Sequence, residues 1–152
     1  MSSTMILPPA TLGMLGGGQL GRFFVSAAHE MGYQVWVLDP DRNSPAGRIA
    51  ERHFCVDYND YATLDEFAQG CAAITTEFEN VPAHVGLLAQ EEGVPVRPGA
   101  HVLHTAQQRL REKEFLRDHG LPTARFAAVR AREDLPAALA HTGLPAVLKT
   151  AA

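Results

Sequence analysis

The stretch Thr11-Leu-Gly-Met-Leu-Gly-Gly-Gly-Gln-Leu-Gly-Arg22 decides the fold. Its first five residues form a short apolar run, which predicts a β-strand, and the glycines that follow predict a tight turn. A helix is expected over 19–31. Its apolar residues recur at spacings of three and four, which predicts one buried face: Leu20, Phe23, Phe24, Ala27, Ala28 and Met31. A second strand over 34–38 completes a strand–helix–strand unit, the building block of a parallel sheet.

The same alternation continues as far as residue 96. Helices are expected over 46–52, 64–70 and 82–92, and strands over 53–56, 72–76 and 94–96. Strands that alternate with helices predict a doubly wound α/β domain with a parallel sheet. Its core is expected to bury five residues together between sheet and helix: Leu15, Phe24, Val37, Leu38 and Ile74.

Three segments are expected along the chain. Residues 1–9 read as a leader, 10–103 as the first α/β domain and 104–152 as the start of a second domain. In this last segment we expect a charged helix over 105–119, a strand over 126–129, a helix over 133–141 and a strand over 146–149. A strand that runs to the end of the chain suggests truncation.

Composition limits the classes of function. Apolar residues make up 46% of the chain, charged residues 20%, and the net charge is −4, which argues against nucleic-acid binding. No apolar run approaches the roughly 20 residues that span a membrane. Cys55 and Cys71 belong to no metal or redox motif, so reduced thiols in a cytoplasmic protein are expected.

The glycine turn is open to three interpretations. Gly16, Gly18 and Gly21 satisfy the G-x-G-x-x-G spacing, and Asp39 lies 18 residues after Gly21. This pattern fits an NAD site in which the acidic residue holds the ribose. It also fits a tight strand-to-helix turn without a ligand. Because a helix follows, its free amides could instead bind a phosphate or the sugar that carries it.

Further motifs, taken in order, distinguish these interpretations. They are Leu15-Gly-Gly-Gly-Gln-Leu-Gly-Arg22, Val37-Leu-Asp-Pro40, Thr76-Glu-Phe-Glu-Asn-Val81, Gln107-Gln-Arg-Leu-Arg-Glu-Lys113, Leu121-Pro-Thr-Ala124 and Pro145-Ala-Val-Leu-Lys-Thr150. Together they resemble the N-terminal part of the N5-carboxyaminoimidazole ribonucleotide synthetases, ATP-grasp ligases of purine biosynthesis. The resemblance covers nearly the whole chain. It implies a Rossmann-like pre-ATP-grasp domain over 10–103 and the beginning of an ATP-grasp domain over 104–152.

The resemblance also implies a reaction. ATP phosphorylates bicarbonate to carboxyphosphate, and the amine of 5-aminoimidazole ribonucleotide captures the carboxyl group. ATP and Mg²⁺ are the implied cofactors, with the magnesium ligands and the glycine-rich phosphate loop expected in a C-terminal part beyond Thr150. Relatives of this kind are commonly dimers, so a homodimer is an expected assembly.

The resemblance assigns individual residues to two ligands. Gly18, Gln19 and Leu20 would hold the ribonucleotide, with Glu77 and Asn80 facing it from the end of a neighbouring strand. The role of Glu79 is left open. The nucleotide contacts would be Arg109 and Lys149, the latter at the end of a buried strand. No catalytic residue and no metal ligand is expected within this chain.

Two other functions stay open at this point. An NAD-dependent oxidoreductase would need a catalytic Tyr–Lys pair and a substrate domain, and the sequence shows neither. A binding module or pseudoenzyme could have kept only the ribonucleotide cleft. The 152-residue chain alone is expected to be inactive.

Overall fold

The structure is a computed structural model that describes residues 5–78, 80–82, 84–85, 89 and 91–151. The chain divides into two compact units, Met1–Leu103 and His104–Ala152. In the described part of the chain, no helix has the length and apolar character needed to span a membrane.

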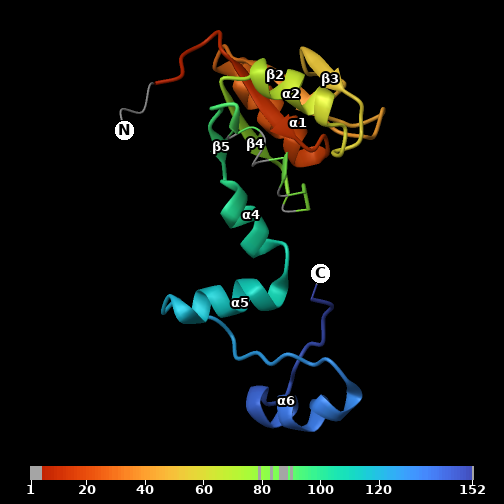
Figure 1. The fold of residues 1–152 in the computed structure, drawn as a ribbon, viewed down its shortest axis with the longest axis vertical. Coiled ribbons are helices and arrows are strands. Elements are labelled where there is room, and N and C mark those ends of the chain that lie inside the picture. The colour runs from red at the N-terminus through yellow and green to blue at the C-terminus, as the bar shows by residue number, and fades with distance from the viewer. Residues whose placement is uncertain (1–4, 79, 83, 86–88, 90, 152) are drawn as a thin grey trace. The chain divides into compact units, whose positions relative to one another are not determined.

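The first unit is built on a five-stranded parallel sheet, with strand order β3-β2-β1-β4-β5. Figure 1 labels β2, β3, β4 and β5 of this sheet. The strands are β1 (Thr11–Leu15), β2 (Gln34–Leu38), β3 (Arg52–Phe54), β4 (Ala73–Thr76) and β5 (Val96–Arg97). Its helices are α1 (Gln19–Glu30) and α2 (Tyr61–Gln69), and α4 (Ala100–Ala106) follows β5. This order, with β1 at the centre, confirms the predicted doubly wound α/β fold.

Apolar residues cover both faces of the sheet. Met14 and Val37 pack on one face with Val25 and Ala28 of α1. The adjacent strand residues Leu15 and Leu38 point to the opposite face. There they pack with Ile74 of β4 and with Leu64 and Phe67 of α2. Because side chains alternate along a strand, the core is two layers and the five predicted core residues do not all meet. Four of them are buried, whereas Phe24 is half-buried at the edge of the α1 layer.

The predicted buried face of the first helix is only partly correct, since Ala28 is buried and Phe24 half-buried but the other four residues are exposed. Leu20 and Phe23 are 63% and 61% exposed, and the buried residues of α1 are Gly21, Val25 and Ala28. A Cβ on Gly21 would lie 2.7 Å from the Gly16 carbonyl oxygen, so the helix contacts the turn through a residue without a side chain. The spacing of apolar residues cannot predict such a contact, because glycine has no side chain to contribute to the pattern.

Two predictions in the middle of the unit are corrected. Residues 46–51 form turns and bends instead of a helix, because the Ala46 amide donates to the Gly17 carbonyl oxygen and the Glu51 amide to that of Val35. Helix α2 begins three residues earlier than expected. The Asp60 side chain accepts a hydrogen bond from the Thr63 amide at 3.1 Å and caps the helix there.

The helix expected over 82–92 falls partly outside the described residues. The described positions 84, 85, 89 and 91 are helical. Val85 and Ala89 are buried in the layer that contains α2, so these two residues pack on the same face of the sheet.

The second unit contains α5 (Arg109–Asp118), a 3-10 turn η1 (Arg132–Asp134) and α6 (Leu135–Thr142). One helix over 105–119 was expected, but α4 ends and α5 begins around Gln108, whose side chain caps α5 by accepting from the Arg111 amide at 2.6 Å. The segments 126–129 and 146–149, predicted as strands, pair with no strand among the described residues.

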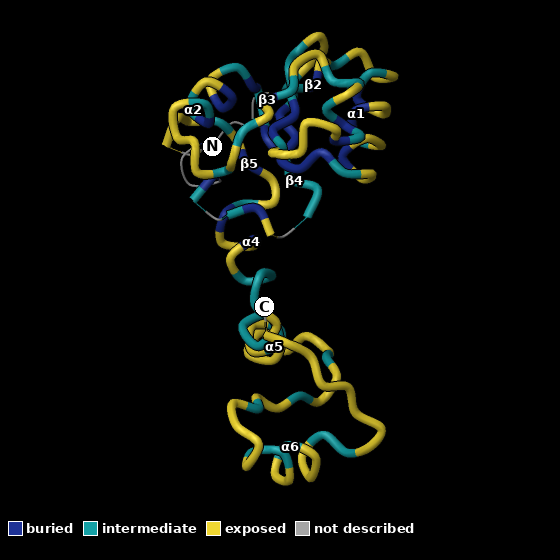
Figure 2. Tube along the Cα trace, turned by 90° about the vertical axis from the view of Figure 1, so that its right-hand side faces the viewer, coloured by how far each residue is buried: buried dark blue, intermediate teal, exposed yellow. Residues whose placement is uncertain are grey.

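Burial differs sharply between the two units. In Figure 2 the buried segments lie in the first unit, and the described residues from 104 onward are intermediate or exposed. Val147 and Leu148 are 80% and 74% exposed. Apolar side chains of unit His104–Ala152, such as these two, are therefore not enclosed by its described residues.

Candidate functional site

The glycine turn lies at the carboxyl end of β1, between the ends of β2 and β4. The Gly16 amide donates to the Leu38 carbonyl oxygen at 3.0 Å, and the Glu77 amide donates to that of Leu15 at 2.9 Å. Gly16 has a φ of +97°, a conformation that a residue with a side chain rarely adopts. In open parallel sheets this edge is where ligands bind.

Glu77 occupies the amides at the start of α1. Its Oε2 accepts a hydrogen bond from the Gly18 amide at 2.6 Å, and its Oε1 accepts one from the Leu20 amide at 3.3 Å. A carboxylate is stabilised there by the partial positive charge of a helix N-terminus. Any ligand oxygen that binds these amides must therefore displace the Glu77 carboxylate or share them with it.

Asp39 holds the other side of the turn. Its Oδ2 accepts from the Gly17 amide at 2.6 Å and its Oδ1 accepts from the Asp41 amide at 2.7 Å. Both oxygens therefore bind the protein's own backbone. These backbone hydrogen bonds account for an acidic residue after β2. No contact with a nicotinamide ribose has to be assumed for Asp39.

The structure places the other residues predicted to bind the ribonucleotide as follows. Gln19 is exposed at the first position of α1, and Asn80 is exposed after the end of β4. Leu20 contributes its amide, while its side chain points outward. Glu79 lies outside the described residues. The turn thus brings Gly18, Leu20 and Glu77 into direct contact, as their places in the sequence suggested.

Sequence reasoning missed three polar residues beside the turn. Ser44 is only 2% exposed, and its Oγ accepts from the Gly47 amide at 3.2 Å. The His53 Nε2 lies 3.0 Å from the Asp39 carbonyl oxygen. The Tyr58 hydroxyl is buried without a hydrogen-bond partner in the described structure. Ser44 and Tyr58 follow the ends of β2 and β3, so polar residues after strand ends were the available signal for these two, whereas His53 lies inside β3.

Tyr58 is the titratable group near the turn whose pKa changes most clearly. Burial, followed by the charges of Asp39, Glu77 and Asp57, raises the pKa of Tyr58 well above its usual range. Its phenol therefore keeps its proton at physiological pH and remains a hydrogen-bond donor.

Arg109 and Lys149, the predicted nucleotide contacts, line one cavity of about 1110 Å³ within the second unit. Three further cationic side chains line it: Lys113, Arg125 and Arg130. The Lys113 Nζ donates to the Thr123 Oγ1 at 2.6 Å. The expectation that Lys149 ends a buried strand is wrong, since Lys149 is exposed and its segment forms no strand. The cavity is nonetheless rich in positive charge, which suits a polyphosphate.

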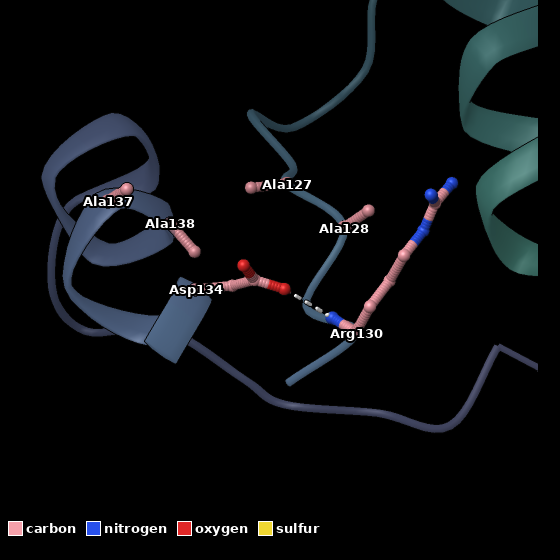
Figure 3. Close-up of a pocket in the computed structure, with 6 residues that line it drawn as sticks. All are labelled: Ala127, Ala128, Arg130, Asp134, Ala137 and Ala138. Atoms are coloured by element: carbon pink, nitrogen blue, oxygen red, sulfur yellow. Dashed lines mark hydrogen bonds between the residues drawn. The ribbon is translucent and has the colours of Figure 1, made fainter. Parts of the chain in front are cut away.

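A smaller hollow of about 410 Å³ adjoins α6 (Figure 3). Asp134 accepts hydrogen bonds from the amides of Arg130 and Ala131 at 2.8 and 3.0 Å, which lower the pKa of its carboxyl. The Arg130 side chain points away from Asp134 in Figure 3, and the remaining labelled residues are alanines. Most side chains that line this hollow are therefore methyl groups, which cannot hydrogen-bond a ligand.

Comparisons with known proteins identify the family. Residues 9–107 match the family described as "Ribonucleotide synthetase preATP-grasp domain". The chain is 38% identical over 149 residues to the N5-carboxyaminoimidazole ribonucleotide synthase of Brucella melitensis, covering 98% of this chain and 41% of the relative.

Solved structures agree with this match. The synthetase from Thermus thermophilus is 40% identical with a TM-score of 0.78, over 88% of this chain and 37% of that one. The synthase from Aspergillus clavatus, solved with ADP and 5-aminoimidazole ribonucleotide, is 31% identical with a TM-score of 0.74, over 90% and 37%.

The chain thus spans about two fifths of the length of these relatives. The comparisons favour a synthetase over the NAD-binding oxidoreductase. The pre-ATP-grasp match covers the glycine turn and all five strands of the sheet. This chain belongs to the ribonucleotide synthetase preATP-grasp domain family and is similar to the N5-carboxyaminoimidazole ribonucleotide synthetases.

Proposed function

We propose that this chain forms the ribonucleotide-binding part of an N5-carboxyaminoimidazole ribonucleotide synthetase. The enzyme would use ATP to phosphorylate bicarbonate, and the amine of 5-aminoimidazole ribonucleotide would capture the carboxyl group of carboxyphosphate. The observation that carries the proposal is the glycine turn, whose amides bind the Glu77 carboxylate. This turn lies at the carboxyl edge of the sheet, in the part of the chain that matches the pre-ATP-grasp family.

The ribonucleotide is proposed to lie against this turn. Gly18 and Leu20 present backbone amides, while Gln19 and Asn80 present exposed side-chain amides. Glu77 adds a carboxylate that can accept a hydrogen bond from a sugar hydroxyl or an amine. Together they offer donors and acceptors to one polar ligand, as specific small-molecule sites do.

ATP is proposed to engage the second unit. Residues 104–152 would begin the ATP-grasp domain, with Arg109 and Lys149 directed to phosphate oxygens in the cationic cavity. Mg²⁺ is proposed to accompany ATP, and its ligands would come from the C-terminal part that the relatives carry. A cytoplasmic location and a homodimer complete the proposal.

Calorimetric titration of the chain with 5-aminoimidazole ribonucleotide, AMP and NAD tests the ribonucleotide site. We expect the aminoimidazole ribonucleotide to bind most tightly and NAD to bind least. Gly18→Val should abolish that binding, because its branched side chain would fill the space beside the Gly18 amide, now taken by the Glu77 carboxylate, that a ligand needs to contact the backbone. Ala27→Val is the matched control, since it adds the same branched side chain to an exposed position of α1. Preferential binding of NAD would overturn the proposal.

A further inference from the structure

The backbone of Gly17 is held on both sides by the segment 39–46, which follows β2. Its amide donates to the Asp39 Oδ2 at 2.6 Å, and its carbonyl oxygen accepts from the Ala46 amide at 2.8 Å. A Cβ on Gly17 would lie 2.6 Å from the Ser44 side chain, so the segment also packs directly against this glycine. Because Gly17 directly precedes the amides proposed to bind the ribonucleotide, segment 39–46 decides where those amides lie.

The glycine turn needs this support because its own residues do not restrict it. The three consecutive glycines 16–18 have the largest backbone freedom of any residue type and no side chains that could limit it. A loop that becomes ordered only when a ligand binds loses affinity to that ordering, whereas a loop already held in place does not. Contacts that hold Gly17 should therefore raise the affinity for a ribonucleotide without touching it.

His53, in the middle of β3, fixes the start of the supporting segment. Its Nε2 lies 3.0 Å from the Asp39 carbonyl oxygen. A carbonyl oxygen can only accept, so Nε2 carries the proton and donates. The Asp39 amide donates to the Phe54 carbonyl oxygen at 3.1 Å, so β3 binds both main-chain groups of Asp39. The direction in which Asp39 extends its carboxylate towards Gly17 depends on this anchoring.

The imidazole ring of His53 is closely packed against the same segment. A Cβ on Gly47 would lie 2.5 Å from the His53 Nδ1. The buried Ser44 Oγ lies 3.5 Å from the His53 Nε2, a longer contact than the one with Asp39. This packing restricts the ring to the orientation in which it donates to the Asp39 carbonyl oxygen.

We propose that His53 is a positioning residue for the ribonucleotide site. It anchors Asp39, and Asp39 in turn holds Gly17 in place. The backbone amides that follow Gly17 are thereby presented to the ligand in a fixed arrangement. This inference rests on the proposed function, since it requires a ligand at the glycine turn. His53 acts through Asp39 and does not contact the ligand itself.

Two substitutions at residue 53 test the inference by calorimetric titration with 5-aminoimidazole ribonucleotide. His53→Leu removes the donor and should weaken binding about fivefold, because Asp39 loses one anchoring hydrogen bond. His53→Gln places an amide nitrogen at about the position of Nε2, so its affinity should stay within about twofold of wild type. Equal losses in the two variants would overturn the inference, since the hydrogen bond would then not matter.

A double-mutant cycle tests whether His53 acts through Asp39. In an Asp39→Ala background, His53→Leu should change affinity by less than about twofold, because the carboxylate that His53 positions is already absent. A fivefold loss in both backgrounds would mean that His53 contacts the ligand itself, and would overturn the inference. If Asp39→Ala does not fold, the comparison of leucine with glutamine at residue 53 still decides.

Thermal unfolding separates positioning from a general loss of stability. His84 is the matched control, because its Nε2 lies 3.1 Å from the Tyr58 carbonyl oxygen and makes the same kind of hydrogen bond. His53→Leu and His84→Leu should lower Tm by similar amounts, but only His53→Leu should weaken ribonucleotide binding. Affinity that falls equally in both variants would overturn the inference. Wild-type chain that binds no ribonucleotide would refute the proposed function, whereas binding that His53→Leu leaves intact would refute only this inference.

Discussion

At the scale of single residues, the Glu77 carboxylate ties the end of β4 to the start of α1. It satisfies two amides that the first helical turn would otherwise leave without intrahelical acceptors. Glu77→Ala should therefore lower the free energy of unfolding by about 1–2 kcal/mol, as loss of a helix cap does. Urea denaturation would measure this change.

Two comparisons sharpen that prediction. Glu77→Gln keeps a neutral acceptor and should lose less than the alanine variant. Glu30→Ala removes an exposed carboxylate at the other end of α1 and should change stability by less than about 0.5 kcal/mol. Equal losses for Glu77→Ala and Glu30→Ala would show that the cap contributes nothing specific.

At the scale of elements, the rotation of α1 decides which of its residues stabilise the fold. Val25 is fully buried against the sheet, so Val25→Ala should cost about 2 kcal/mol from lost burial and the cavity left behind. Phe23 is mostly exposed, and Phe23→Ala should cost less than about 0.5 kcal/mol. The reverse order in chemical unfolding would support the face that the sequence predicted.

The sheet itself gives a second prediction at this scale. Leu15 of β1 and Ile74 of β4 are buried in the layer that contains α2. Leu15→Ala or Ile74→Ala should each lower the free energy of unfolding by about 2–5 kcal/mol, because a large aliphatic side chain is removed from a packed layer. Losses under about 0.5 kcal/mol at both positions, in the same unfolding assay, would contradict the position of the sheet.

At the scale of the whole molecule, the second unit is poorly suited to hold a phosphoryl group in place during its transfer. Phosphoryl transfer requires cations held in a dry, preorganised site. Lys149 is exposed to water, in a unit whose apolar side chains are also exposed. We therefore expect the purified 152-residue chain to release no bicarbonate-dependent ADP above background, measured by a coupled ADP assay.

Complementation provides the control for that result. If the remaining length found in the relatives is supplied, in the same chain or as a second one that docks, activity should appear. Lys149→Ala should then reduce it, because a phosphate would lose a cationic partner. Turnover by the 152-residue chain alone that is lost in Lys149→Ala would contradict this prediction.

The sequence by itself determined the class of fold and the approach of Glu77 to the glycine turn. The bounds of β1 and β2 agree with the apolar runs 11–15 and 34–38, because strand positions follow from local hydrophobicity and flanking turn residues. Polar residues after the strand ends placed Glu77 beside the glycine turn, since parallel strands end at one edge. The motifs in order indicated the family that the comparisons confirm.

Tertiary structure alone decided how those parts meet. The buried face of α1 follows from the close approach of Gly21 to the turn, and a glycine carries no hydrophobic signal. Residues 46–51 could have continued as a helix, but hydrogen bonds to the Gly17 and Val35 carbonyl oxygens hold them as turns. The occupation of the Gly18 and Leu20 amides by Glu77 joins residues more than fifty positions apart. Such contacts depend on three-dimensional distance, which neither residue type nor spacing along the chain specifies.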